Sequence, residues 1–344
     1  MNSSALYQLL AYVLGENDAE SVVSKVFVDD RILQRPVRGN VDRATIAQGL
    51  CLSLFFDLLR RVPSAKRYVN EFVEPKQKIV FDHGAVRTVK LEGMGGLPAG
   101  EEAILRLLRP LGFVMRGTYP LPGLHIVGRS YAHAEFPETM PQFFISEILL
   151  ENFSDRFKET AVRAFSASRD PITPELRLAL ETLETKGSLP FHDAANVVLF
   201  GTRCFDRQHE IPAEEDYRVL CAESLEMAWI LSEGNAFNHA TDRVSDLAAL
   251  HKRLREAGYR IKPDIEVSKN GRVRQTALLA DPVTRRFKDS NGETCERTVP
   301  GSFYEFIERA SYSENGESRP DLSFDSSNAT GIFHMTAGAG LSGV

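Results

Sequence analysis

Two histidines stand in matching surroundings, and imidazole is a side chain that binds metal ions or transfers protons near neutral pH. His83 lies in the run DHGAVR and His239 in the run NHATDR, so each histidine is followed four residues later by an arginine, Arg87 or Arg243. The repeated H-x-x-x-R pattern predicts that both histidines occupy equivalent places in a duplicated unit.

A glutamate follows each histidine at a similar distance: Glu147 lies 64 residues after His83, and Glu305 lies 66 residues after His239. If the first and last strands of each unit lie side by side, these side chains can point into one concave face. Two imidazoles and one carboxylate form the facial triad of non-haem Fe(II) enzymes, which leaves positions open for a chelating substrate and O₂. Neutral histidines and an ionised Glu305 would leave Fe(II) with a net positive charge, which suits an anionic ligand.

The same order of elements, strand, helix and three strands, surrounds each histidine. The first unit has strand candidates at 78–91, 113–119, 124–131 and 142–150, and a helix at 103–111. The second has strand candidates at 235–244, 264–269, 272–280 and 301–309, and a helix from Val244 to Ala257. Asn270-Gly271 between two of these strands predicts a hairpin, because a type I′ turn needs positive φ at both central positions.

Helices are expected outside these units. Residues 43–62 carry apolar side chains at helical spacing and are followed by Pro63, and Thr173-Pro174 is typical of a helix start. The predicted fold is therefore α+β, with paired βαβββ modules that form a curved sheet around a metal cavity. The predicted segments are a helical N-terminal segment (1–77), the first module (78–151), a helical insertion (152–231), the second module (232–310) and a C-terminal tail (311–344).

Composition excludes several classes of protein. The 344 residues are 43% hydrophobic and 26% charged, as in a globular protein, and the net charge of −6 gives no overall attraction to nucleic acid or an anionic membrane. The four cysteines form no C-x-x-C pair, which argues against a zinc ribbon or a disulfide framework. No apolar run reaches the ~18 residues of a membrane span, and we expect a cytoplasmic protein. No feature indicates an oligomeric state.

Three motifs resemble a known family. The doubled β-α-β-β-β order is similar to the vicinal oxygen chelate, or glyoxalase, superfamily. Within it, FDHGAVRTV, NHATDRV and FYEFIER most resemble the 2-oxoadipate dioxygenase/decarboxylase family, over residues 40–310. FYEFIER also resembles the FFEIIQR strand of 4-hydroxyphenylpyruvate dioxygenase. That match selects Glu305 over Glu308, and the two residues would face opposite sides of a strand.

The resemblance implies a site and a reaction. It places the metal ligands on His83, His239 and Glu305, which with Arg87 would also surround the substrate. It implies Fe(II) as the cofactor, O₂ as the second substrate, and conversion of 2-oxoadipate into 2-hydroxyglutarate and CO₂. Arg87 would hold a substrate carboxylate through a bidentate pair of hydrogen bonds. Better known members are longer, and the family's C-terminal substrate contacts cannot be placed after Arg309.

Two other interpretations stay open from the sequence. With Glu147 as a fourth ligand, the site would resemble that of glyoxalase I, an isomerase that uses Ni(II) or Zn(II). In the second interpretation, the protein has the same fold but binds a small ligand without a metal ion and without catalysing a reaction. The remaining histidines are expected to have ordinary structural roles; they are His125, His133, His192, His209, His251 and His334.

Overall fold

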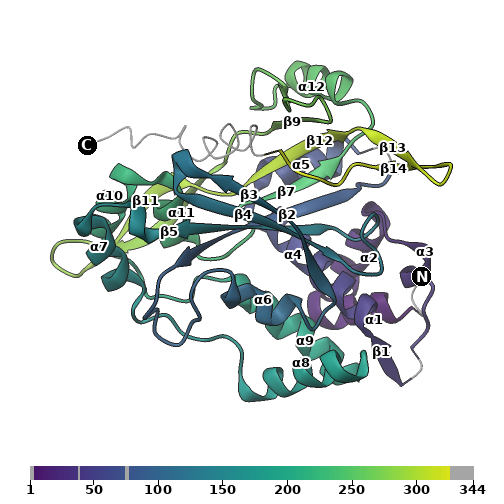
Figure 1. Cartoon of the computed structure of the whole chain (residues 1–344), viewed down its shortest axis with the longest axis horizontal. Helices are drawn as coiled ribbons and strands as arrows, with labels where there is room; N and C mark the ends of the chain where they lie inside the picture. The colour runs from purple at the N-terminus through teal and green to yellow at the C-terminus, as the bar shows by residue number, and fades with distance from the viewer. Residues whose placement is uncertain (1–3, 38, 74–76, 326–344) are drawn as a thin grey trace.

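The structure, a computed structural model, describes residues 4–37, 39–73 and 77–325. A mixed sheet of eight strands runs through the middle of the molecule, with helices packed around it (Figure 1). In spatial order the strands are β3 (Phe113–Leu121), β4 (Ile126–His133), β5 (Gln142–Leu149), β2 (Phe81–Lys90), β7 (His239–Arg243), β12 (Phe303–Arg309), β9 (Val273–Ala277) and β8 (Glu266–Val267).

The sheet consists of two βαβββ modules joined at its centre, which confirms the predicted fold class. In the first module β2 pairs in parallel with β5, and in the second β7 pairs in parallel with β12. The crossover helices are α6 (Glu102–Leu108) and α12 (Leu247–Glu256). Strands β2 and β7 pair antiparallel, so the first strands of the two modules form the join and place both histidines near the middle of the sheet.

The second module differs from the prediction in two places. Its helix begins at Leu247 rather than Val244, because the side chain of Asp246 caps the first turn by accepting from the amide of Ala249. A hairpin, β10 (Pro282–Lys288) and β11 (Thr294–Pro300), is inserted before β12 and was not predicted. The predicted hairpin at Asn270-Gly271 is confirmed, since β8 and β9 pair antiparallel around it and Gly271 has φ +69°.

Helices of the N-terminal segment and of the insertion between the modules pack around the sheet (Figure 1). The N-terminal helices are α1 (Ala5–Leu14), α2 (Glu16–Lys25), α3 (Asp30–Leu33), α4 (Arg43–Arg61) and α5 (Pro63–Glu71). The helices between the modules are α7 (Asp155–Phe165), α8 (Pro174–Lys186), α9 (Phe191–Gly201), α10 (Glu214–Glu223) and α11 (Leu225–Glu233), and short strands β1 (Asn40–Asp42) and β6 (Ser188–Pro190) pair between these groups. The predicted helix over 43–62 is confirmed, as is the start of α8 at Thr173-Pro174.

One face of the sheet packs against α4 and α5, and the other carries the polar residues of the site. Phe55 of α4 and Tyr68 of α5 contact Tyr304 of β12, and Tyr68 also contacts Phe306. These aromatic residues alternate along β12 with Glu305, which points the other way, as the pleat of a strand requires. The apolar face therefore fixes the sheet in place while its other face is left for chemistry.

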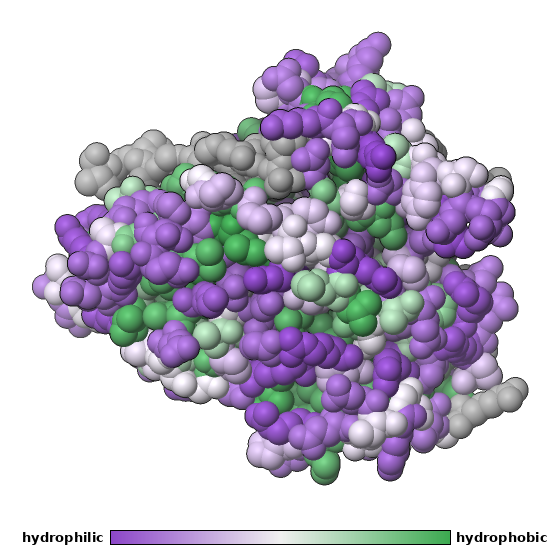
Figure 2. Space-filling model, viewed as in Figure 1, coloured by the Kyte–Doolittle hydropathy of each residue, from purple (hydrophilic) through white to green (hydrophobic). Residues whose placement is uncertain are grey.

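The face of the molecule drawn in Figure 2 is mainly polar. Hydrophilic residues cover most of the face in Figure 2, with small groups of hydrophobic residues between them. Among the described residues, no helix combines the length and apolarity needed to cross a membrane.

The chain after β12 forms a second hairpin and then returns to the sheet. Strands β13 (Ser311–Glu314) and β14 (Glu317–Pro320) pair antiparallel, and the following segment lies against β5 and β3, where Gln142 donates to the carbonyl of Leu322. The part of the predicted tail at 326–344 lies outside the described residues.

Candidate metal centre

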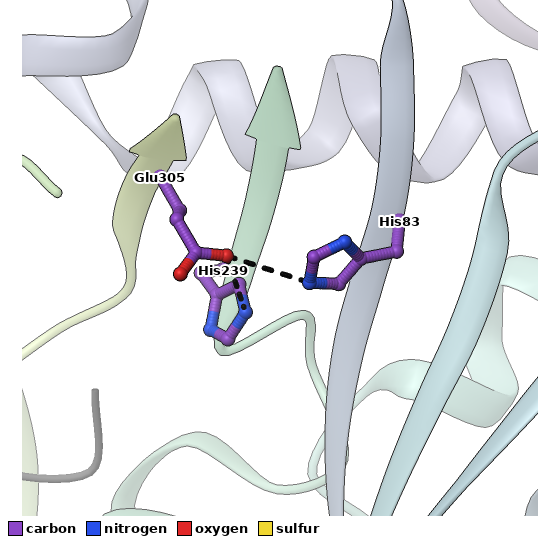
Figure 3. A group of neighbouring side chains, drawn as sticks. All are labelled: His83, His239 and Glu305. Atoms are coloured by element: carbon purple, nitrogen blue, oxygen red, sulfur yellow. Dashed lines mark ion pairs between the residues drawn. The ribbon is translucent and has the colours of Figure 1, made fainter. Parts of the chain in front are cut away.

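His83, His239 and Glu305 lie together on the polar face of the sheet, on three adjacent strands (Figure 3). The carboxylate oxygen Oε2 of Glu305 is 3.4 Å from Nε2 of His83 and 3.5 Å from Nε2 of His239. All three side chains are buried, and their potential ligand atoms lie within 4.8 Å of one another. Among the described residues, no other group of three histidine, cysteine or acidic side chains has this arrangement.

A β-bulge aims His83 into the site. Phe81 pairs with Asp242 and His83 with Thr241, so β2 has one residue more than β7 at this point, and that residue is Asp82. The bulge reverses the alternation of side chains. Phe81 therefore packs against Phe55 in the core, whereas His83 faces the metal site.

Outer hydrogen bonds orient both imidazoles. Nδ1 of His83 donates to Oδ1 of Asp82 at 2.8 Å, and Nδ1 of His239 lies 3.2 Å from Oδ1 of Asn238. A histidine whose Nδ1 carries the proton presents the lone pair of Nε2, which is the arrangement that metal-binding histidines use. In both repeated runs, DH and NH, the residue directly before the histidine supplies the acceptor oxygen, and this shared feature is visible in the sequence.

The two carboxylate oxygens of Glu305 differ in their contacts with the described part of the chain. Thr241 donates its hydroxyl proton to Oε2 at 2.6 Å. Oε1 is buried and has no hydrogen-bond partner among the residues that the structure describes. A buried carboxylate oxygen left in this state is costly unless a ligand satisfies it. Two imidazoles and this oxygen are a donor set that fits a divalent metal ion, for which Nε2 of His83 would give up its 3.1 Å contact with the hydroxyl of Thr241.

The electrostatic environment favours neutral His239 and ionised Glu305. Burial, which outweighs the opposing charge of Glu305, lowers the pKa of His239 to about 3 together with smaller effects of His83 and Arg87. Burial alone would raise the pKa of Glu305, but His239 and His83 outweigh it and hold the pKa below its usual value. His239 is thus in the protonation state that a metal ligand requires at neutral pH.

His83 and Asp82 form a more strongly charged pair. Burial lowers the pKa of His83, but its hydrogen bonds to Asp82 and Glu305 outweigh burial and raise the pKa above the ordinary value. Burial also opposes the ionisation of Asp82, yet the guanidinium of Arg309 and the ring of His83 hold its pKa well below the usual range. Asp82 therefore remains a charged acceptor for the Nδ1 proton of His83.

Arg87 lies on the same face of β2 as His83, four residues along the strand. Its guanidinium carbon is 5.2 Å from the centre of the Trp229 ring, and Nε1 of Trp229 donates to the carbonyl of Gly301, which fixes that ring. Burial lowers the pKa of Arg87 to about 10 against the opposing charge of Glu226, so the guanidinium is still positive at neutral pH. The structure thus places a buried cation close enough to influence His239.

Glu147 and Glu308 do not join the three ligands. Oε1 of Glu147 accepts from the amide of Glu101, and Oε2 accepts from Arg129 at 3.4 Å. Glu308 faces the other side of β12, where it accepts from the amide of Leu247 at the start of α12. The four-ligand arrangement with Glu147 is therefore not formed.

Strand register explains why Glu147 does not reach the site, although it follows His83 at nearly the same chain distance as Glu305 follows His239. In the second module Phe303 pairs with His239, and the candidate ligand Glu305 lies two residues further along. In the first module Gln142 pairs with His83, so the equivalent position is Phe144. Glu147 is three residues beyond Phe144, an odd number, and so it lies on the opposite face of β5.

Sequence reasoning missed two residues beside His83. Arg309 binds Asp82, and the Phe324 ring contacts the ring of His83 with centroids 4.8 Å apart. Arg309 ends the run FYEFIER and was treated only as the end of a strand, while Phe324 lies in a polar stretch that had no expected packing role. The described histidines outside the triad have structural contacts, such as the hydrogen bonds of His209 and His251 to backbone carbonyls.

Comparison with known proteins identifies the family. A sequence model of the 2-oxoadipate dioxygenase/decarboxylase family matches residues 55–333. The chain belongs to this family. The family's chloroplastic 2-oxoadipate dioxygenase/decarboxylase from Arabidopsis thaliana is 24% identical over 86% of this chain and 81% of its own length. A member from Mycobacterium tuberculosis is 26% identical, and the match covers 71% of this chain and 60% of that protein.

Solved structures of the family and superfamily share the fold. A glyoxalase superfamily protein from Ralstonia eutropha JMP134 is 46% identical, with a TM-score of 0.87 over 93% of this chain and 98% of that one. The hydroxyglutarate synthase of Oryza sativa, solved in complex with 2-oxoadipate, is 21% identical with a TM-score of 0.63, over 86% of this chain and 93% of that one. These similarities agree with the paired-module architecture.

Proposed function

We propose that this protein is an Fe(II)-dependent dioxygenase that decarboxylates a 2-oxo dicarboxylic acid, converting 2-oxoadipate and O₂ into 2-hydroxyglutarate and CO₂. The observation that carries the proposal is the buried triad of His83, His239 and Glu305 in a chain of the 2-oxoadipate dioxygenase/decarboxylase family. The reaction balances without an external reductant. One oxygen atom of O₂ enters the new carboxylate and the other becomes the hydroxyl group.

The number of ligands supports this reaction. Three protein donors leave coordination positions for a bidentate 2-oxo acid and for O₂, as in other enzymes with two histidines and one carboxylate. Bound Fe(II) would supply the activation of O₂ and polarise the keto group for loss of CO₂. A Ni(II) or Zn(II) isomerase with a second glutamate is less well supported, because Glu147 binds Arg129 and the amide of Glu101 instead.

Arg87 is the residue assigned to the substrate. A guanidinium offers two parallel donors to a carboxylate, and burial against Trp229 makes this interaction stronger than it would be in water. Because Arg87 and His83 share one face of β2, a dicarboxylate can reach the metal with one end and Arg87 with the other. Arg87 would thus orient the substrate chain, and its positive charge would favour an acid over a neutral aldehyde or ester.

Aromatic side chains would keep water away from the reacting atoms. The ring of Phe303 stacks on His239 with centroids 4.7 Å apart, and Phe324 contacts the ring of His83 edge-on. A dry site strengthens the interaction of Arg87 with a carboxylate and protects reactive species from side reactions.

The test is oxygen consumption by the Fe(II)-loaded protein. The substrates to compare are 2-oxoadipate, 2-oxoglutarate, 4-hydroxyphenylpyruvate and the methylglyoxal-glutathione adduct. We expect O₂ uptake with 2-oxoadipate, matched mole for mole by CO₂ and 2-hydroxyglutarate. Isomerisation of the glutathione adduct under nitrogen would contradict the proposal and support a glyoxalase. Binding of an oxo acid without metal and without turnover would instead indicate a ligand-binding protein.

A further inference from the structure

Arg309, the last residue of β12, is a buried cation between the metal site and the chain that follows. Its side chain is 0% exposed. Nε donates to Oδ2 of Asp82 at 2.9 Å, and Nη2 donates to Oδ1 at 2.8 Å, which is the bidentate geometry of a strong arginine-carboxylate pair. Asp82 in turn accepts the Nδ1 proton of His83. The three side chains form a continuous chain of hydrogen bonds that ends at a metal ligand.

The other side of the guanidinium is held by the returning chain, residues 321–324, which we call the covering segment. Nη1 of Arg309 donates to the carbonyl of Asp321 at 3.0 Å and to that of Ser323 at 2.7 Å. The guanidinium carbon lies 4.9 Å from the centre of the Phe324 ring, and this ring contacts His83. One side chain thus contacts both the acid that orients His83 and the segment that covers it.

The rest of the covering segment is anchored to the first module. The amide of Phe324 donates to the hydroxyl of Tyr119 at 3.3 Å, and Gln142 donates to the carbonyl of Leu322 at 3.2 Å. The carbonyls that bind Arg309 therefore have a fixed position. Because the guanidinium is planar, fixing Nη1 also fixes the direction in which Nε and Nη2 reach Asp82.

We propose that Arg309 is a positioning residue of the metal centre, which acts through Asp82 to hold the imidazole of His83 in the tautomer and orientation that metal binding requires. The inference rests on the proposed metal site. Removing the guanidinium would leave Asp82 as a buried charge without its main partner, and the side chain would rotate or take up a proton. In either case the hydrogen bond that orients His83 is lost or weakened.

The experiment measures Co²⁺ binding to the full-length, metal-free protein, with the visible absorption of the bound ion as a second readout. Arg309→Met should weaken Co²⁺ binding by about 10- to 100-fold, the usual cost of losing an outer partner of a metal ligand, and should shift the absorption bands. Arg309→Lys should lose less Co²⁺ affinity than Arg309→Met, because lysine keeps the positive charge. It should still bind Co²⁺ more weakly than the wild type, because lysine does not hold both carboxylate oxygens of Asp82 in a bidentate pair. Each variant is first checked for cooperative thermal unfolding.

The matched control is Arg272→Met. Arg272 contacts the same covering segment through an ion pair with Asp321 at 3.1 Å, but it is an exposed residue without a contact to Asp82. We expect its Co²⁺ affinity and spectrum to match the wild type. If Arg309→Met does not fold, the Co²⁺ affinities and spectra of Arg309→Lys and Arg272→Met are compared instead. A weaker affinity in Arg309→Lys alone would support the proposal.

A double substitution tests the route through Asp82. Asp82→Asn should also weaken Co²⁺ binding, and Arg309→Lys combined with Asp82→Asn should lose little more than Asp82→Asn alone, because residues that act in one chain are not additive. Losses that multiply would overturn the route, as would Co²⁺ affinities and spectra of the Arg309 variants equal to those of Arg272→Met. A wild-type protein that binds no Co²⁺ would overturn the metal site itself, and so the two failures are distinguishable.

Discussion

The two modules have the same strand order but contribute unequally to the candidate metal centre. Each places a histidine on its first strand, whereas only the second has a carboxylate on the site-facing side of its last strand, since Glu147 of β5 faces the other way. There, Glu305 pairs in the sheet with Thr241, which donates a hydrogen bond to it. The equivalent pair in the first module is Phe144 and Ala85, which are both apolar.

This difference shows how a duplicated fold can yield an asymmetric site. The Phe144 ring contacts Phe324, which covers His83, so the first module provides an apolar wall at the place where the second provides a ligand. A carboxylate on both sides would give four protein ligands and fill a position that the substrate needs. A site with one acidic side chain therefore leaves room for the direct binding of substrate to the metal that we propose.

Among the substitutions considered, removal of the Glu305 carboxylate should have the largest effect on metal binding. Glu305→Gln should weaken Fe(II) binding by more than the roughly 10- to 100-fold cost of losing an outer partner, because it removes the only negative ligand. Metal content after dialysis measures this. Glu308→Gln is the control, because Glu308 faces α12, and equal metal loss in both variants would contradict the assignment of Glu305.

The second largest effect is expected from the two arginines related by the repeat, Arg87 and Arg243, whose substitution should affect substrate binding unequally. Arg87→Lys should leave metal content unchanged but raise KM for 2-oxoadipate by about 10- to 100-fold, since a bidentate contact with a buried carboxylate is lost, at about 1.4 kcal/mol for each factor of ten. Arg243→Lys should change KM little, because the Arg243 guanidinium donates to the carbonyl of Glu138 and lies 3.6 Å from Oδ2 of Asp82, and we assign it no substrate contact. Steady-state kinetics test both variants, and an equal rise in KM would show that substrate is not held on the Arg87 side.

A carboxylate introduced at Phe144, the position equivalent to Glu305, should make the two modules contribute the same ligands. Phe144→Glu should tighten Ni²⁺ binding by about tenfold, or roughly 1.4 kcal/mol, and abolish O₂ uptake, because the new side chain takes a position that substrate requires. Calorimetric titration and oxygen electrode measurements follow the two changes. Glu147→Gln is the companion variant and should leave Ni²⁺ affinity unchanged. If Glu147→Gln weakens Ni²⁺ binding instead, the register argument is wrong.

On the apolar face of the sheet, the modules differ in a titratable group. Asp242 is related by the repeat to Val86, and burial raises its pKa to about 7, although hydrogen bonds from Tyr68 and the amide of Val80 act in the other direction. The folded state therefore holds this proton more tightly than the unfolded state. Its stabilising contribution is complete below about pH 4 and is lost as the pH rises toward 7.

Asp242→Asn should remove this pH dependence. The stability of the variant relative to the wild type should rise between pH 5 and pH 7 by at most about 1.4 kcal/mol for each pH unit, and then stay constant. Urea unfolding of both proteins at each pH measures the difference. A difference that does not change with pH would show that Asp242 titrates normally.

The sequence predicts those parts of the site that depend on local pattern. His83 and His239 are recognisable because the H-x-x-x-R run occurs twice, and the period of a strand separates Glu305 from Glu308. The hairpin at Asn270-Gly271 follows from turn chemistry. The hairpin β10-β11 was missed although Asn291-Gly292 offers the same signal, because its strands carry many charged residues.

The remaining features depend on pairing across the chain. The position of a carboxylate in the first module depends on the register of β2 and β5, which chain distance alone does not determine. The bulge at Asp82 reverses the side-chain alternation of β2, and its partner Arg309 is 227 residues away. No local pattern predicts either, because both arise from how the two modules meet.

Because β2 and β7 come from different modules, a metal ion bound at their junction would also stabilise the association of the two modules. Its ligands come from both sides of the join, so the ion would cross-link two halves of the chain that are separated by the inserted helices. A ligand that binds only the joined state stabilises that state, by about 2.7 kcal/mol at a concentration of 100 times its Kd. The supply of that metal would then set the fraction of molecules in which the two halves are joined, and the metal-free protein would be the form most exposed to proteolysis.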